Sequence, residues 1–290
     1  MTKGHFPETD QKAALRHRGH SLIRALCREQ GNDDVAYYGL SGIMVEDILL
    51  WQDVLSHAYI VERPIKDRVQ RERFQSKVLF ALQTPLSGNV RIVYDDVWHH
   101  MASDEFCSFD PFPQVVNLDF CGGFEYSNLE YPKQKVALQN LFRCAREATS
   151  SFVLFLTLMP RDRGREKYKN FLSQQRALVE PAVVGSGRSD GVDLLDANVK
   201  FHEQSNLRLF KACLPLLIAD IGRGEHYRVK QEYVRLYTKM VHLAFTCEFV
   251  TGAMALPVAV SSIVETLNAP MRKLETDGTE KLTRPPQIPL

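Results

Sequence analysis

The chain has 290 residues, of which 44% are hydrophobic and 24% are charged. This apolar content is sufficient for a large folded core and excludes a disordered or fibrous protein. A formal net charge of +1 gives no overall basic signal for nucleic acid, although local basic segments can still bind it. Length and composition therefore suit one large α/β domain, or one domain with a helical addition, and leave the partner open.

The six cysteines form no CxxC or CxxH pair. Their spacing indicates neither a zinc site nor a small disulfide scaffold, and it favours a reducing compartment. No uninterrupted apolar run approaches the roughly 20 residues that cross a bilayer, and no apolar signal region is found at the N-terminus. We expect a soluble, cytoplasmic protein with no metal site and no membrane partner.

Apolar periodicity predicts alternating helices and strands along the first half of the chain. In chain order these are a helix over 11–30, a short strand that enters the loop 38–42, a helix over 45–55, a strand over 57–62, a helix over 65–82, strands over 90–94 and 115–119, a helix over 133–149 and a strand over 151–158. This order predicts a Rossmann-like, mostly parallel sheet with right-handed crossovers.

The C-terminal half is predicted to add helices and one strand pair. Residues 196–222 have helical spacing, and we assign a helical insertion to about 196–239. Two apolar runs, 240–249 and 253–260, are predicted to pair as antiparallel strands at the end of the sheet. The resulting division is an N-terminal helix at 1–34, a Rossmann-like domain at 35–265 and an extended or disordered tail at 266–290.

The most informative stretch is Val-Val-Asn-Leu-Asp-Phe-Cys-Gly-Gly-Phe at 115–124. A strand that is buried on both faces reads as an apolar run, and ligands of open α/β sheets bind outside the carboxyl ends of such strands. Asp119 is therefore expected at the rim of a cleft, because an acid after buried apolar positions is costly unless it is paired or lies at an opening. Cys121 is a candidate nucleophile, but a small buried residue is the favoured interpretation.

Earlier strand ends supply a glycine loop at 38–42, then Glu62, and then Asp95 or Asp96. A nucleoside cofactor needs close backbone approach at the first turn, a carboxylate for its ribose at the second strand end and a polar group near its base. Each acid also has a structural alternative: Glu62 as a solvated turn residue, and Asp95 or Asp96 as a helix cap, with Asp96 favoured as the cap. His99 and His100 are adjacent and do not indicate a metal site.

With these strand ends, roughly residues 35–160 resemble the class I S-adenosylmethionine-dependent methyltransferases. The stretch 116–123 is most similar to the Leu-Asp-Pro-Phe/Tyr-Gly motif of tRNA guanine-N2 dimethyltransferases. It is also similar to the Asp-Pro-Pro-Tyr motif of amino-methylating nucleic-acid enzymes and to three-Cys-motif partner proteins of bacterial defence islands.

The resemblance implies a methyltransferase that uses S-adenosylmethionine to modify an amino nitrogen of a nucleic-acid base. Asp119 would accept a hydrogen bond from the target amine, and Phe120 would stack on the base. The implied cofactor-binding residues are Tyr38, Gly39, Leu40, Gly42, Glu62, Asp95 and Asn117. The basic residues Arg161, Arg163 and Arg165 are candidates for binding nucleic-acid phosphates, with a solvated loop as the alternative.

Two other functional classes stay open at this point. The first loop has few glycines and no proline follows Asp119, and these departures motivate the alternative of an inactive methyltransferase-like subunit that binds or regulates partners in a defence or RNA-modification complex. An NAD-dependent oxidoreductase is disfavoured because the first turn has no GxGxxG. A protein partner in a complex is a further expectation, whereas the oligomeric state and the methyl acceptor, whether RNA, DNA or protein, stay open.

Overall fold

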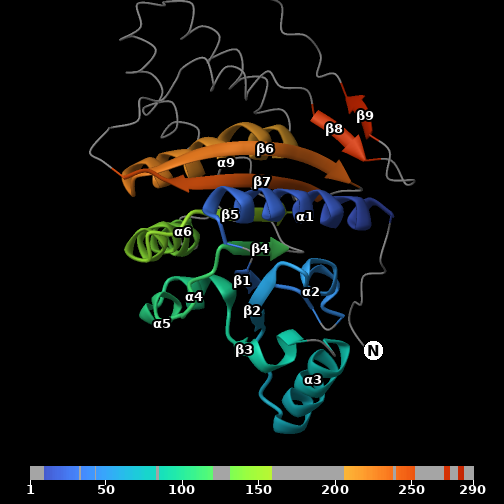
Figure 1. The fold of residues 1–290 in the computed structure, drawn as a ribbon. Helices are drawn as coiled ribbons and strands as arrows, with labels where there is room; N and C mark the ends of the chain where they lie inside the picture. The colour runs from blue at the N-terminus through green and yellow to red at the C-terminus, as the bar shows by residue number, and fades with distance from the viewer. Residues whose placement is uncertain are drawn as a thin grey trace, which may run out of the picture.

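The computed structural model describes nine segments of the chain. They are residues 10–32, 34–42, 44–82, 85–119, 131–158, 206–237, 240–251, 271–274 and 280–283. Helices and strands alternate along most of the chain, and four strands follow one another at its C-terminal end (Figure 1). None of the described helices has both the length and the apolar character needed to cross a membrane.

The described strands form one nine-stranded sheet in the order β3-β2-β1-β4-β5-β7-β6-β8-β9. The first five strands are parallel to one another, and β7 runs antiparallel to both β5 and β6. The strands are β1 (Val35–Gly39), β2 (Leu55–Glu62), β3 (Val90–Tyr94), β4 (Val115–Asp119), β5 (Phe152–Leu158), β6 (Tyr227–Tyr237), β7 (Met240–Phe249), β8 (Met271–Leu274) and β9 (Glu280–Thr283). The predicted Rossmann-like sheet with an antiparallel final pair is confirmed.

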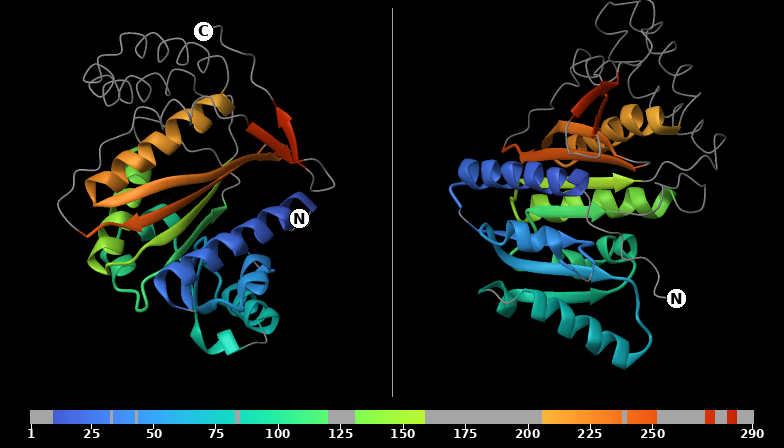
Figure 2. Two further views of the ribbon diagram at one scale, coloured as in Figure 1. Left: turned by 45° about the horizontal axis from the view of Figure 1, so that its top comes forward. Right: turned by 90° about the vertical axis from the view of Figure 1, so that its right-hand side faces the viewer.

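Helices cover both faces of this sheet (Figure 2). One face packs against α1 (Asp10–Gln30), α2 (Glu46–Trp51) and α3 (Arg68–Ala81). The other packs against α4 (Val97–Met101), α5 (Asp104–Cys107), α6 (Tyr131–Glu147) and α9 (Asn206–Gly224). A short 3₁₀ helix, η1 (Pro85–Asn89), leads into β3. Two-sided coverage explains why β4 and β5 read as apolar runs.

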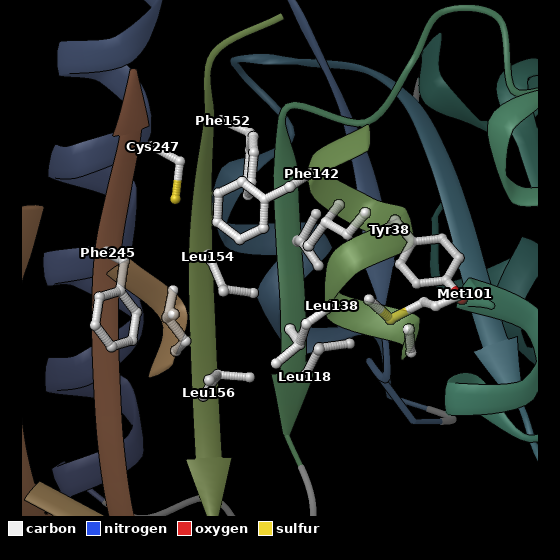
Figure 3. Packing of buried hydrophobic residues seen from close by; sticks show 14 of the residues in the cluster. Tyr38, Met101, Leu118, Leu138, Phe142, Phe152, Leu154, Leu156, Phe245 and Cys247 are labelled. Atoms are coloured by element: carbon white, nitrogen blue, oxygen red, sulfur yellow. The ribbon is translucent and has the colours of Figure 1, made fainter. Parts of the chain in front are cut away.

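The core on the α6 side contains large side chains from the central strands and from α6 (Figure 3). Phe142 on α6 makes edge-on ring contacts with Phe152 on β5 and with Tyr227 at the start of β6. All three side chains are at most 1% exposed. Burial of such side chains contributes on the order of 2 kcal/mol each, so this contact fixes α6 and β6 on the sheet.

The final strand pair has different members from those predicted. Residues 227–237 form β6, which pairs antiparallel with β7 over its whole length, so the predicted helical insertion over 196–239 is wrong in its last part. Residues 253–260, predicted to be the partner of 240–249, lie outside the described residues. Within the predicted tail, β8 and β9 extend the sheet beyond β6.

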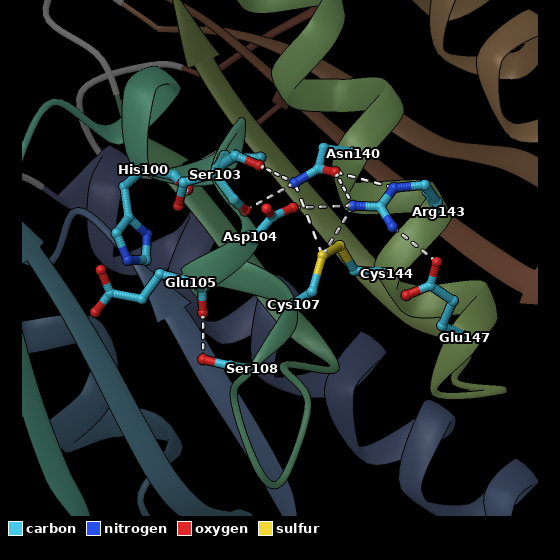
Figure 4. The surroundings of a disulfide bond; sticks show 11 residues. His100, Ser103, Asp104, Glu105, Cys107, Ser108, Asn140, Arg143, Cys144 and Glu147 are labelled. Atoms are coloured by element: carbon cyan, nitrogen blue, oxygen red, sulfur yellow. Dashed lines mark hydrogen bonds and ion pairs between the residues drawn. A yellow bond between two sulfur atoms is a disulfide. The ribbon is translucent and has the colours of Figure 1, made fainter.

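A disulfide between Cys107 and Cys144 joins α5 to α6 (Figure 4). The Arg143 guanidinium donates to the Cys107 sulfur at 3.2 Å and to Glu147 at 2.8 Å. The sequence did not predict this bond, because the two cysteines are 37 residues apart and meet only through the packing of the two helices. Cys27 and Cys247 are buried and take no part in a disulfide.

Candidate functional site

The predicted strand-end residues lie along one edge of the sheet. Gly39 at the end of β1 is in register with Ile60 of β2 on one side and with Asn117 of β4 on the other. Glu62 is in register with Tyr94, the last residue of β3. The parallel strand directions therefore bring the first loop, Glu62, Asp95 and Asp119 to the carboxyl edge, as the sequence predicted.

Two glycines of the first loop have different roles. A Cβ at Gly39 would lie 2.1 Å from the backbone oxygen of Asn117, so this glycine lets β1 and β4 approach closely. Gly42 has a φ of +63° and would have open space around an added Cβ. Between them, the Ser41 hydroxyl is buried and makes no hydrogen bond with any described residue. The loop therefore has an open turn next to an unsatisfied polar group.

The side chains of Tyr38 and Leu40 point away from this loop. Tyr38 is fully buried on the α4 side, and its hydroxyl lies 3.0 Å from Nδ1 of His100. Burial raises the pKa of the Tyr38 hydroxyl and lowers that of His100. Leu40 packs against the same core, while its N–H donates to the Asn117 oxygen. These two residues offer little besides backbone atoms to a ligand.

The acids at the ends of β2 and β3 differ in their hydrogen bonds. Among the described residues, Glu62 accepts one hydrogen bond, from the N–H of Arg63 at 2.9 Å. Both oxygens of Asp95 are engaged, one by the N–H of Asp96 and the other by Nδ1 of the exposed His99 at 2.8 Å. This contact raises the pKa of His99. Asp96 caps α4 by accepting from two backbone N–H groups, which confirms its predicted capping role.

Asn117 faces a buried charge cluster between the sheet and the N-terminal helices. Its side-chain amide donates to Asp47 of α2 at 2.8 Å. Arg16 of α1 forms ion pairs with Asp47 and, at 2.9 Å, with Glu46. The sequence predicted Asn117 as a cofactor-binding residue, and in the structure its side-chain amide contacts this cluster.

Asp119 lies beside the same cluster, and burial raises the pKa of its carboxyl group to about 6. The charge of Asp47 raises this pKa further, whereas Lys12, Arg16 and a hydrogen bond from Thr157 lower it. A carboxyl group with a pKa near 6 is mainly ionised at neutral pH and acts as a hydrogen-bond acceptor.

A cavity of about 30 Å³ lies between α1, α2 and the ends of β4, β5 and β7. It is large enough for a water molecule or a group of similar size. Its lining consists of Lys12, Leu15, Arg16, Gly19, Asp47, Trp51, Asn117, Asp119, Phe155, Thr157 and His242. Most of the polar residues in this lining were not predicted from the sequence.

A sequence signal for part of this lining exists in the two helices. Asp47 and Trp51 are four residues apart and therefore share one helix face, and both are buried. Lys12 and Arg16 flank the buried stripe of α1 that contains Leu15 and Gly19. An acid on an apolar helix face opposite such a basic pair indicates a buried ion pair. Thr157 and His242 carry no comparable local signal.

Several predicted residues cannot be placed. Phe120, Cys121 and the basic residues Arg161, Arg163 and Arg165 lie outside the described residues. Within the described segments, no group of three or more His, Cys, Asp or Glu side chains is arranged to hold a metal ion.

The order β3-β2-β1-β4-β5-β7-β6 with β7 reversed defines the class I S-adenosylmethionine-dependent methyltransferase fold. The carboxyl-edge loop and acids lie where that fold has its ligand. No protein-family model and no curated protein sequence matches the chain. The assignment of this fold therefore rests on the order and directions of the strands.

Solved structures of methyltransferases are similar to this chain at low identity. Trm1 from Pyrococcus horikoshii, in complex with S-adenosyl-L-methionine, is 12% identical, with a TM-score of 0.48 over 100% of this chain and 67% of Trm1. The methyltransferase domain of bacterial CtHen1-C is 9% identical, with a TM-score of 0.42 over 81% and 99% of the two chains. Magnesium protoporphyrin IX methyltransferase from Synechocystis PCC 6803, with bound SAH, is 11% identical, with a TM-score of 0.39 over 84% and 90%.

Proposed function

We propose that the protein is an S-adenosylmethionine-dependent methyltransferase that acts on an amino nitrogen of a nucleic-acid base. The observation that carries this proposal is the position of Asp119. Asp119 is the last residue of β4, is partly buried at the carboxyl edge, and lines a cavity of the size of a single amino group. A carboxylate acceptor in such a cavity suits an amino group that enters the cavity while the base ring that carries it stays outside.

The residues of the carboxyl edge fit a nucleoside cofactor. The open turn at Gly42 leaves room for close backbone approach, and the buried Ser41 hydroxyl has no partner among the described residues. Glu62, at the end of β2, is the proposed acceptor of hydrogen bonds from the ribose hydroxyls. Asp95 is the proposed contact near the base. A ligand there would share the Asp95 oxygens with the N–H of Asp96 and with His99.

The bound cofactor supplies an electrophilic methyl group on a sulfonium. The protein then has to hold the acceptor nitrogen in line with that methyl group and keep its lone pair available. Asp119 orients the amine by accepting one N–H, and Phe120 is proposed to stack on the base. A neutral amine that is positioned in this way needs little further activation.

Nucleic acid is the proposed acceptor because the 116–123 stretch resembles the motif of base-modifying enzymes. The proposed phosphate contacts are Arg161, Arg163 and Arg165, which follow β5 in the sequence. Phosphate contacts by arginine give affinity without reading base sequence. Alanine at all three positions should weaken binding of unrelated nucleic acids equally and reduce its salt dependence.

The direct test is methyl transfer from S-adenosylmethionine labelled in its methyl group to RNA and DNA pools, followed by digestion to nucleosides. We expect label on an exocyclic base nitrogen and a loss of about 100-fold or more in Asp119→Asn. Asp34→Asn, at an exposed position, is the matched control and should keep the wild-type rate. Label on protein or on ring carbon would reject the proposed acceptor.

The second candidate is a catalytically inactive subunit of a defence or RNA-modification complex. It is favoured by the engagement of both Asp95 oxygens and of the Asn117 side chain within the protein. In that case the purified chain would bind neither S-adenosylmethionine nor S-adenosylhomocysteine.

A further inference from the structure

Four polar side chains occupy equivalent register positions on four neighbouring strands. Asp119 of β4 is in register with Thr157 of β5, which is in register with His242 of β7, which is in register with Arg235 of β6. The last three are between 3% and 9% exposed. This set, the polar row, lies at the carboxyl edge on the face covered by α1.

Further from the carboxyl edge, the same face of the sheet packs apolar side chains. Four residues before Asp119 and Thr157, β4 and β5 carry Val115 and Val153, which are fully buried. Buried polar groups cost free energy unless every one is hydrogen bonded, and apolar replacements are often neutral or stabilising. Stability alone therefore does not account for a hydroxyl and an imidazole at this edge.

The hydrogen bonds of the row have only one consistent direction. Asp119 and Thr157 are in register on neighbouring strands, and an ionised carboxylate only accepts, so in a hydrogen bond between them the Thr157 hydroxyl is the donor. The Thr157 oxygen lies 2.8 Å from Nδ1 of His242, and this nitrogen must then carry the proton that it donates. Nε2 of His242 is left as an acceptor, 3.5 Å from the Tyr233 hydroxyl.

The groups around the row keep His242 neutral. Burial lowers the pKa of His242 to about 3, and the charge of Arg235 on β6 acts in the same direction. Tyr233 of β6 stacks on one face of the ring and Phe155 of β5 on the other, at 5.7 and 5.9 Å between centroids. The ring is therefore neutral at physiological pH and packed between two aromatic rings, with its Nδ1 facing Thr157.

We propose that Thr157 and His242 are positioning residues that fix the Asp119 carboxylate where it lines the cavity. Their role in recognising an acceptor amine rests on the function proposed above. The hydrogen-bond chain itself is a property of the protein and can be measured without cofactor or acceptor.

The first experiment follows the protonation of Asp119 by infrared difference spectroscopy against pH, with Asp119→Asn identifying its carboxyl band. Thr157→Val removes the donor, so the titration midpoint of Asp119 should rise, and Thr157→Ser should restore it. His242→Gln should raise the midpoint by a smaller amount, because it releases the Thr157 hydroxyl from its fixed orientation.

Thr246→Val is the matched control, because Thr246 lies on the same face of β7 and donates to a different carboxylate, Glu232, at 2.6 Å. It should leave the Asp119 midpoint unchanged. An unchanged midpoint in folded Thr157→Val, or an equal shift in Thr246→Val, would overturn the hydrogen-bond chain. If Thr157→Val does not fold, Thr157→Ala and His242→Gln decide by the same criterion.

The second experiment separates positioning from substrate binding in the methyl-transfer assay. Thr157→Val should lower kcat by about 10-fold or more with little change in KM, and Thr157→Ser should recover most of the rate. Equal rates in Thr157→Val and wild type would overturn the positioning role. If Thr157→Val shifts the Asp119 midpoint but the wild-type protein transfers no methyl group, the proposed function fails. The hydrogen bonds among Asp119, Thr157 and His242 would still be established.

Discussion

The side-chain amide of Asn117 on β4 donates a hydrogen bond of 2.8 Å to the carboxylate of Asp47 on α2, 70 residues earlier in the chain. Arg16 of α1 pairs with the same carboxylate. This contact ties the two N-terminal helices to the centre of the sheet, directly beside Asp119.

Asn117→Ala should lower the free energy of unfolding by about 1–3 kcal/mol, because it removes a hydrogen bond to a buried carboxylate. Urea denaturation measures the loss. Asn89→Ala is the control, since its amide donates to the Ser56 carbonyl at an exposed position and should cost less than about 1 kcal/mol. Equal losses in both variants would contradict the buried contact.

Gly39→Ala should be severely destabilising, because the added Cβ would lie 2.1 Å from the backbone of β4. The strands would have to separate where the N–H of Leu40 donates to Asn117. We expect loss of soluble expression or a fall of several kcal/mol, measured by thermal unfolding. Gly88→Ala, which has open space and an ordinary φ, should stay within about 0.5 kcal/mol of wild type.

The Asp119 carboxyl group should make the folded state less stable as pH rises. Its folded pKa of about 6 exceeds the unfolded value near 3.8, so the folded state binds the proton more tightly. Its contribution to stability is complete below pH 3.8 and is lost as pH rises through 6, by roughly 3 kcal/mol. Asp119→Asn should therefore gain stability relative to wild type between about pH 4 and 7, measured by urea unfolding. A constant difference across that range would contradict the raised pKa.

His242 should act in the opposite direction. Its folded pKa of about 3 lies below the unfolded value of 6.5, so the unfolded state binds the proton more tightly between these values. The contribution of His242 is present above pH 6.5 and is lost as pH falls towards 3. His242→Leu removes this dependence, so its stability relative to wild type should improve on acidification. Unfolding curves at about pH 7 and about pH 4.5 compare the two proteins.

The Cys107–Cys144 disulfide predicts one cross-linked peptide pair in a protease digest under non-reducing conditions. Reduction should lower stability by about 2–4 kcal/mol, because the unfolded chain then gains the freedom of the loop between the two cysteines. Mass spectrometry after alkylation, before and after reductant, measures the pair. Full alkylation of both cysteines without reductant would contradict the bond.

The strands were predictable where burial on both faces leaves an apolar run, as in β4 and β5. β6 was missed because its register shifts between Gln231 and Tyr233, which breaks the alternation of buried and exposed positions. Its first half reads Tyr-Arg-Val-Lys-Gln-Glu, which is too charged for an apolar run and out of phase with the second half of the strand.

The strand-end acids were predictable because parallel topology alone brings them to one edge. The partners of Asp119 were not predictable, because Arg16, Asp47, Thr157 and His242 come from four separate elements. The contact of α1 with the sheet brings Arg16 to the site. Long-range packing determines how these residues come together, although the buried faces of α1 and α2 carry a sequence signal for the ion pair of Arg16 and Asp47.

Binding of S-adenosylmethionine tests the central claim most directly. Calorimetry should give saturable binding in the micromolar range, weakened at least about 10-fold in Glu62→Ala by loss of the ribose contact. Glu248→Ala is the matched control, because it removes an exposed carboxylate at the opposite edge of the sheet and should bind like wild type. Absence of binding to both S-adenosylmethionine and S-adenosylhomocysteine in the folded wild-type protein would contradict the account and favour the inactive subunit.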